Sequence, residues 1–341
     1  MKRFNPLKVI TFLVLFLWVA ILVAAATGAV MVPLVDMIKA LLSIEPTPQQ
    51  NYNTIILDIR LPRVFLAAIV GAILALSGAV MQGLFRNPLA DPSLIGVTAG
   101  ASVGASLVIV LAATYSHQWI GLPLISLGAF GGGVTAVCLV YRLATGAYGT
   151  SVATMLLAGI GISALAGSVT GLLEFYADNE MLRRMSLWRM GGLDGANYIK
   201  VIFALCMLLL LLILLPQYSQ VLNALLLGES EARHLGIDTE GFKKIAIVSV
   251  AAAVGISVAL AGVISFIGLI VPHILRLIIG PNHRFLLPAS ALGGACLLVV
   301  ADNLSRILLA PTELPVGLIT AFIGVPFFIS LLKRRYVYGL H

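Results

Sequence analysis

The residues that could do chemistry gather in one polar stretch, Leu225–Lys244, with the sequence LLLGESEARHLGIDTEGFKK. The chain has 35 charged residues (21 Lys and Arg plus 14 Asp and Glu), and seven of them fall between Glu229 and Lys244. Two very apolar blocks flank this stretch. Its pattern predicts a short amphipathic helix, a glycine break and a second polar turn. We interpret it as a handle on a membrane protein that a soluble partner can grip.

Other patterns that carry chemistry are missing from the sequence. It contains neither the phosphate-binding motif G-x-x-x-x-G-K-[ST] nor the motif H-E-x-x-H. The five histidines show no ligand spacing, and the three cysteines, at 138, 206 and 296, lie inside apolar runs. We therefore expect no catalytic residues, no metal site and no disulfide framework. An enzyme acting inside the membrane would need a catalytic cluster, which makes that reading remote.

Acidic residues deep inside apolar runs would indicate ion-coupled transport, and the sequence offers no strong candidate. Asp302 lies four residues before Arg306, which predicts an ion pair across one helical turn near the outer face. Glu174 lies at the outer end of another apolar run. We therefore expect the energy to come from another chain that is gripped on the cytoplasmic side. A secondary transporter driven by protons or sodium is the alternative class.

Composition predicts the elements that must position these residues. Hydrophobic residues make up 60% of the chain and charged residues 10%, whereas soluble domains carry about 25% charge. Several apolar runs approach or exceed the roughly 20 residues that a helix needs to cross a bilayer. We predict an all-α polytopic membrane protein, in which the net charge of +7 reflects membrane topology and not nucleic-acid binding. Ten transmembrane helices are expected, at about 7–27, 60–84, 94–113, 121–142, 152–173, 199–216, 244–262, 285–304 and 315–332, together with a short eighth span that carries His273 and Arg276 and ends near Gly280. A short re-entrant segment or half-helix is expected before it, at Gly262–Pro272.

The expected organisation is a single domain over 1–341. Its first half is about 1–198, its second half is about 199–341, and a cytoplasmic loop at 217–243 lies in the second half. The segment AILALSGAVMQGL (72–84) resembles SVALAGVISFIGL (257–269), and the two run in opposite directions across the membrane. Inverted repeats of this kind are typical of transporters. A chance match of small and aliphatic residues is the alternative.

The N-terminus and the basic residues set the topology. Lys2, Arg3 and Lys8 precede the apolar run Val9–Ala26, which is longer than the 7–15 residues of a signal-peptide core. We therefore prefer an uncleaved first helix to a signal peptide, and a short surface helix is expected at Val32–Leu42. Both termini and the 217–243 loop are predicted to be cytoplasmic, because most Lys and Arg then lie inside. Those inside number 13 of 21: positions 2, 3, 8, 86, 142, 233, 243, 244, 276, 284, 333, 334 and 335.

Arginines on the opposite side gather at the outer ends of the predicted helices. Interfacial snorkelling is the simple explanation for any single one. We interpret the whole set as a basic outer rim that docks an acidic soluble partner. Charge complementarity of this kind steers the encounter of two proteins and fixes their register. The set comprises Arg60, Arg63, Arg183, Arg184, Arg189 and Arg306.

Several motifs resemble one family in order along residues 55–335. They are RLPR (60–63), LSGAVMQGLFRNPLADPSLIG (76–96), GESEARHLGI (228–237), FIGLIVPHILRLIIGPNHRFLLPAS (266–290) and the stretch Ala301–Phe328. These motifs resemble the FecCD-type permeases, which are membrane subunits of bacterial ABC importers for iron-siderophores, haem and vitamin B12. The resemblance implies a type II ABC importer permease fold in the inner membrane. It also implies a homodimer, two cytoplasmic ATPase subunits, a periplasmic binding protein, and no ATPase site in the chain itself.

The resemblance also assigns residue roles. It implies that Arg60, Arg63 and Arg306 receive acidic residues of the binding protein, and that the helix between the sixth and seventh spans couples to the ATPase. The coupling residues would be Gly228, Glu229, Glu231, Ala232, Arg233, His234, Leu235 and Gly236. Gates should be short and lie near the inner end of the pathway, so we expect them at Asn87, Thr150 and Ser151. A helix cap beside the following proline is an equal explanation for Asn87.

Within the family, two stretches favour the haem importers. These are GESEARHLGID (228–238) and TGLLEFYADNEMLRRMSLWRMGGL (170–193). The expected cargo is therefore haem, delivered by a periplasmic haem-binding protein, with ATP used by the partner subunit and no permanently bound cofactor. Arg183 or Arg184 could meet the haem propionates at the mouth of the pathway. A ferric siderophore and then cobalamin are the alternative cargoes.

Overall fold

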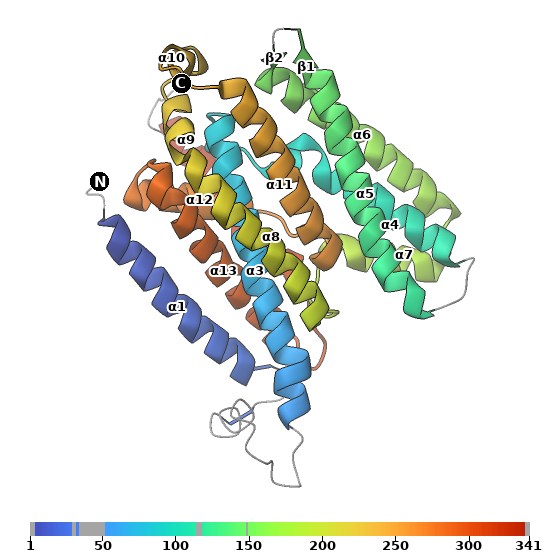
Figure 1. The fold of residues 1–341 in the computed structure, drawn as a ribbon. Helices are drawn as coiled ribbons and strands as arrows, with labels where there is room; N and C mark the ends of the chain where they lie inside the picture. The colour runs from blue at the N-terminus through green and yellow to red at the C-terminus, as the bar shows by residue number, and fades with distance from the viewer. Residues whose placement is uncertain (1–3, 29–31, 34–51, 114–117, 148, 338–341) are drawn as a thin grey trace.

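The computed structural model describes the chain except for residues 1–3, 29–31, 34–51, 114–117, 148 and 338–341. It is a bundle of helices with one short β-hairpin (Figure 1). The surface helix expected at Val32–Leu42 lies almost entirely outside the described residues.

The bundle is built mainly from ten longer helices in the described part of the chain. They are α1 (Pro6–Ala26), α3 (Leu61–Leu84) with the π-helical turn η1 (Thr54–Arg60) before it, α4 (Val97–Ala113), α5 (Gln118–Ala144), α6 (Val152–Tyr176), α8 (Tyr198–Leu214), α11 (Thr239–Ala261), α12 (Ile267–Ile279), α13 (His283–Ile307) and α14 (Val316–Val337). Shorter elements connect them: β1 (Thr145–Gly146), β2 (Gly149–Thr150), η2 (Pro92–Ile95), α7 (Asn179–Met190), η3 (Leu215–Tyr218), α9 (Ser219–Leu225) and α10 (Glu229–His234).

Seven helical segments in the described part of the chain are long and apolar enough to cross a membrane. Three shorter apolar helices, Val97–Leu111, Ile267–Ile279 and Val316–Ser330, accompany them. Nine of these segments coincide with spans expected from the sequence. The remaining one, Ile267–Ile279, is a single helix that continues through Pro272, where the sequence suggested a half-helix at Gly262–Pro272 and a separate short span after it. That all ten cross the membrane, and that the two halves are inverted repeats, remain predictions.

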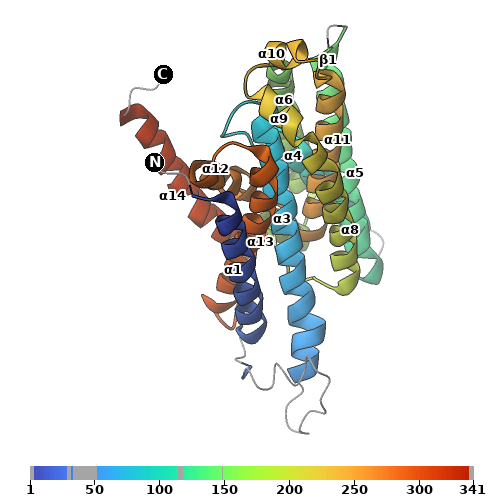
Figure 2. The ribbon, with the colours of Figure 1, turned by 60° about the vertical axis from the view of Figure 1, so that its left-hand side comes forward.

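The helix α3 forms the centre of the bundle. In the most apolar 18-residue stretch of its segment, 89% of the residues are buried. The helix packs against α13, α12, α11 and α8 (Figure 2). Gly71 of α3 and Gly294 of α13 allow the two backbones to touch, because a Cβ on either residue would meet the carbonyl group of the other. By contrast, α1 packs at the edge of the bundle, with 11% of its apolar window buried.

The central helical segment begins earlier than the sequence predicted. It starts at Thr54 instead of Arg60, because the wide turn η1 continues directly into α3. The N–H of Leu61 donates to the carbonyl of Ile56, five residues back. A regular α-helix would drive the ring of Pro62 into the carbonyl four residues before it, and a wide turn relieves that clash. Pro62 therefore lies in the first turn of α3, directly after the π-turn that extends the helical segment backwards to Thr54.

Contacts far apart in sequence define two ends of the bundle. At one end lie α10 and the hairpin β1–β2, at the top of Figure 1, and we name it the coupling end. The start of the described chain lies against the end of α12, since the N–H of Phe4 donates to the carbonyl of Ile278 (3.1 Å). The opposite end, which we name the far end, brings together the end of α1, the start of α3 and the end of α13.

Candidate coupling and gate site

The short helix α10 presents an exposed surface at the coupling end. It starts after Gly228, whose φ of +133° few other residues adopt, and it ends before Gly236, whose φ is +78°. The helix–glycine–polar turn pattern predicted from the sequence is therefore confirmed. Leu227 and Leu235 flank the helix with side chains 70% and 65% exposed. Two exposed leucines beside a charged helix form a surface suited to a protein partner.

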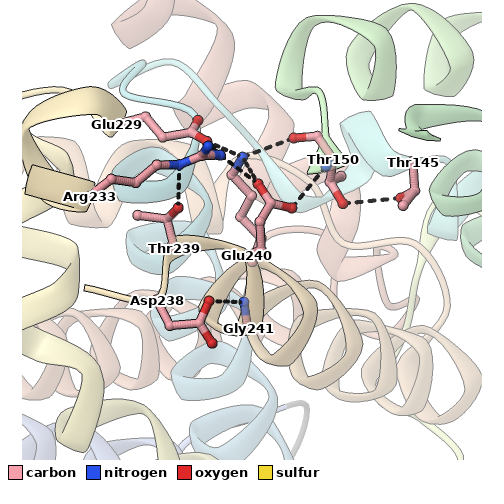
Figure 3. A network of polar contacts seen from close by, with 9 residues as sticks. Thr145, Thr150, Glu229, Arg233, Asp238, Thr239, Glu240 and Gly241 are labelled. Carbon is pink, nitrogen blue, oxygen red and sulfur yellow. Dashed lines mark hydrogen bonds and ion pairs between the residues drawn. The ribbon is translucent and has the colours of Figure 1, made fainter. Parts of the chain in front are cut away.

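The side chains of the predicted coupling residues divide into three groups. Ala232 is fully buried and fixes α10 against the bundle. Glu231, His234 and Leu235 are exposed, so these side chains are available to a partner. Glu229 and Arg233 instead point back toward the chain (Figure 3).

The ammonium group of Lys243 joins α10, α11 and the hairpin. Its side chain is 3% exposed. Its Nζ donates to Oε1 of Glu229 (2.7 Å), to Oε1 of Glu240 (2.8 Å) and to the backbone carbonyl of Thr150 (2.9 Å). An ammonium group has three protons to donate, so this buried charge is fully paired.

Glu240 binds the same hairpin residue from the other side. The N–H of Thr150 donates to Oε2 of Glu240 (2.9 Å). Gly149, with φ of +102°, makes this approach possible, because a Cβ there would lie 2.7 Å from the carboxyl carbon of Glu240. Within the hairpin, Thr145 pairs with Thr150, and their hydroxyl oxygens are 3.1 Å apart. The hairpin is thus held to α11 through backbone groups.

Arg233 adds an outer layer to this cluster. Its Nη2 lies 2.6 Å from Oε1 of Glu229 and 3.1 Å from Oε1 of Glu240, and its Nε donates to Oγ1 of Thr239 (3.1 Å). Its side chain is 49% exposed, so solvent screens these pairs and each contributes little. Partial burial alone would raise the pKa of Glu229, but hydrogen bonds from Lys243 and Arg233 hold that pKa below its ordinary value.

A cavity of about 380 Å³ lies beside the cluster. Two of the predicted gate residues, Thr150 and Ser151, line it. Ser151 also caps α6, since its Oγ accepts from the N–H of Thr154 (3.3 Å). Asn87 is not among the lining residues and its side chain accepts from the N–H of Leu89 (3.0 Å), as expected for a local cap. The full lining is Leu84, Phe85, Arg86, Gly149, Thr150, Ser151, Val152, Ala153, Leu225, Glu229, Arg233, Glu240 and Lys243.

The arginines predicted to dock a binding protein meet at the far end, but they are buried. Arg60, Arg63 and Arg306 are 5%, 7% and 4% exposed. Nε of Arg63 lies 2.8 Å from Oδ1 of Asp302, and its Nη1 lies 2.6 Å from Oε2 of Glu313. Nε of Arg306 lies 3.2 Å from Oδ2 of Asp302, which confirms the ion pair predicted across one turn.

Two of these arginines also close the end of α1. Nη1 of Arg60 donates to the carbonyls of Ala25 (3.0 Å) and Ala26 (2.9 Å), and Nη2 of Arg306 donates to the carbonyl of Ala24 (3.0 Å). The last carbonyls of a helix have no partner within the helix and carry partial negative charge. The arginines turn inward because they bond these carbonyls at the end of α1 and the buried carboxylate of Asp302, whereas the sequence suggested an exposed rim. Their docking role remains a prediction.

The arginines predicted to meet cargo lie on α7. Arg183 and Arg184 are both exposed, and Nη2 of Arg184 lies 2.8 Å from Oε1 of Glu180, one turn away. Their contact with cargo remains a prediction. Glu240 and Lys243 lie at the centre of the cluster, although neither was predicted to be a coupling or gate residue. Ionisable residues in the first turn of an apolar helix were the signal that could have identified them.

Known proteins provide the context for this geometry. Residues 16–334 match the FecCD transport family. The chain is 45% identical over 286 residues to the hemin transport system permease protein HmuU of Yersinia pestis, covering 82% of this chain and 83% of that protein. It is 44% identical over 291 residues to the cobalamin import system permease protein BtuC of Halobacterium salinarum, covering 85% and 76%.

Solved structures agree with these relatives. One, described as an inward-facing conformation of a metal-chelate type ABC transporter, superposes with a TM-score of 0.82 at 32% identity, covering 96% of this chain and 99% of that chain. Another, PsaBC from Streptococcus pneumoniae in complex with Fab, shares the fold at a TM-score of 0.52 and 14% identity, covering 87% and 94%. The fold is that of type II ABC importer permeases, whose ATPase site lies on a separate subunit. This chain is a polytopic membrane permease that belongs to the FecCD transport family.

Proposed function

We propose that this chain is the haem permease of a bacterial ABC importer. It moves haem from the periplasm to the cytoplasm across the inner membrane, and a partner ATPase subunit hydrolyses the ATP. The observation that carries the permease role is the coupling end, where the exposed helix α10 is bonded through Lys243 to a hairpin at the mouth of a cavity. The cargo assignment is supported by the identity to a hemin permease over 82% of the chain.

We place the coupling end and both chain termini in the cytoplasm. The excess of lysine and arginine assigned to that side supports this orientation. The ATPase then grips the face formed by Glu231, His234 and Leu235, all exposed. The chain works as one domain of two halves, about 1–198 and about 199–341, with the 217–243 coupling loop in the second half. Thr150, Ser151 and Asn87 act as the gate at the inner mouth.

The far end faces the periplasm in this proposal and receives the binding protein. Arg60, Arg63 and Arg306 give this end its charge, and Glu313, whose side chain is 39% exposed, is the cluster member that solvent reaches most easily. Docking would then use Arg63 after an acidic residue of the partner displaces Glu313. Such an exchange keeps the arginine paired throughout.

A second copy of the chain completes the pathway in this proposal. The helix α6 supports it, because 17% of its apolar window is buried and three glycines on it, Gly161, Gly167 and Gly171, have open space around the Cβ position. Small residues on an exposed membrane helix allow another helix to approach closely. A disulfide between two copies of Ser168→Cys, which is exposed on α6, should form on oxidation, whereas Ile213→Cys, exposed on α8, should not cross-link.

Cobalamin is the second candidate cargo, because the identity to a cobalamin permease is 44% over 85% of the chain. The two cargoes differ in charge. Haem carries two propionates that Arg183 and Arg184 on α7 could pair with, as charge-assisted hydrogen bonds to carboxylates are among the stronger polar contacts. Substitution of these two arginines should therefore affect the uptake of haem more than the uptake of cobalamin.

The proposal is tested by reconstituting the permease with its ATPase and its binding protein in proteoliposomes. Uptake of haem, cobalamin and a ferric siderophore is measured with and without ATP. We expect ATP-dependent uptake of haem. The double variant Arg183→Ala and Arg184→Ala should reduce haem uptake, whereas Arg189→Ala on the same helix, which pairs with Glu174, serves as the control. Uptake of cobalamin and not haem would refute the cargo assignment, and gradient-driven uptake without ATPase would refute the importer class.

A further inference from the structure

Three elements with different expected roles share one buried cation. Glu229 belongs to α10, which we propose contacts the ATPase. Thr150 belongs to the hairpin, which we propose gates the pathway. Lys243 belongs to α11 and donates to both, at 2.7 Å and 2.9 Å. A single side chain, that of Lys243, therefore connects the coupling helix to the gate.

The bonds to the hairpin use its backbone in both directions. The N–H of Thr150 is held by Glu240, and its carbonyl is held by Lys243. Residues three apart on a helix lie on the same face, so an acid at 240 and a base at 243 match the donor and the acceptor of one residue. This clamp acts on backbone groups, so it fixes the position of the strand β2 whatever side chain occupies 150.

We propose that Lys243 is the positioning residue that ties the gate hairpin to the coupling helix, so that a displacement of α10 by the ATPase is transmitted to Thr150. This inference rests on the proposed function. The ammonium is 3% exposed and has three acceptors. Leaving such a buried charge with an acceptor missing is strongly unfavourable. A moving Glu229 therefore draws Lys243 and the hairpin with it, and the cavity beside Thr150 gives the hairpin room to move.

Substitution of Lys243 separates ATP hydrolysis from transport. In proteoliposomes containing the full complex, Lys243→Met should retain ATP hydrolysis within about twofold while the cargo imported per ATP falls about tenfold or more, as loss of charge-assisted bonds implies. Lys243→Arg can still donate to the same acceptors and should recover most of the ratio. Lys244→Met is the matched control, because Lys244 is the next residue on α11 and is exposed. A merely structural role would lower hydrolysis and import together.

A distance measurement tests the link without any cargo. Spin labels at Ala147→Cys in the hairpin turn and Ser230→Cys on α10, both exposed, are introduced after replacement of the three native cysteines. In the permease–ATPase complex, we expect one narrow distance distribution with Lys243 present, a broad one in Lys243→Met, and a narrow one in Lys244→Met. Should Lys243→Met fail to fold, Glu240→Ala removes the other half of the clamp and should broaden the distribution in the same way.

The outcomes separate the inference from the proposed function. An unchanged import-to-ATP ratio and an unchanged distance distribution in Lys243→Met would overturn the inference. A broad distribution in that variant would support it even if the wild-type complex imported some cargo other than haem. Failure of the wild-type complex to import haem would instead count against the cargo assignment alone.

Discussion

Replacing Asp302 by asparagine tests whether the buried arginine cluster holds the far end together. Asp302 is 1% exposed and lies 2.8 Å from Nε of Arg63 and 3.2 Å from Nε of Arg306. The substitution keeps the size of the side chain and removes its charge. Removing one partner of a buried ion pair costs about 3–5 kcal/mol. Because Arg63 keeps Glu313 and Arg306 keeps the carbonyl of Ala24, we expect the lower end, about 3 kcal/mol.

In the assay, the purified permease is heated in detergent, and the fraction that stays monodisperse is measured at each temperature to give the unfolding midpoint. In domains of 150–250 residues, 1 kcal/mol shifts Tm by about 2–4 °C, and the shift shrinks as the chain lengthens. We therefore expect Asp302→Asn to lower the midpoint by about 4 °C. Glu313→Gln is the control, because its side chain is 39% exposed and such pairs contribute at most about 1 kcal/mol.

Two results would contradict this reasoning. A wild-type midpoint for Asp302→Asn would mean that the arginines are satisfied without the buried carboxylate. An equal fall for Glu313→Gln would mean that the solvent-facing pair, and not the buried one, holds the cluster.

Three further substitutions or conditions have definite expected outcomes. Gly149→Ala places a Cβ 2.7 Å from the carboxyl carbon of Glu240 at a φ of +102°, so we expect about 1–3 kcal/mol of lost stability and reduced import. Gly146→Ala is the control, because its Cβ meets nothing within 4 Å, and this variant should unfold as the wild type does. Gly71→Ala drives a Cβ into the backbone of α13 and should lower the unfolding midpoint relative to the same control. The pKa of Glu229 in the folded protein lies below the ordinary 4.5. The stabilisation that its ionised carboxylate contributes is therefore complete above pH 4.5, and it is lost as the pH falls through the pKa of the folded protein. Protease protection of the hairpin should therefore persist from pH 7 to about pH 4.5, and release near pH 6 would implicate a different group.

Local patterns in the sequence predicted the helices and the coupling segment. The apolar runs are long enough to mark each helix, and Gly228 and Gly236 delimit α10 because both adopt positive φ. The pair Asp302 and Arg306 was also predictable, since residues four apart meet on any helix. These features depend on neighbours within one or two turns, which a single sequence displays directly.

Contacts between distant segments were not predictable in the same way. Lys243 meets a carbonyl 93 residues earlier, and Arg63 meets a carboxylate 239 residues later. No periodicity in the chain indicates either pairing. The arginines were therefore read as an exposed rim from charge and position, and their burial follows from a carboxylate and helix-end carbonyls that only the folded chain brings near.

The capping of α1 has a consequence for how the protein is made. Nη2 of Arg306 donates to the carbonyl of Ala24, which is 282 residues earlier. During synthesis the N-terminal helix enters the membrane first, and domains form as the chain emerges. Arg60 can bond the carbonyls of Ala25 and Ala26 once the start of α3 has been made, but the carbonyl of Ala24 has to rely on water or lipid headgroups until α13 has been translated. A chain truncated before Arg306 lacks one of the two guanidinium groups that fasten α1, so incomplete products would hold the end of this helix less firmly than the finished protein does.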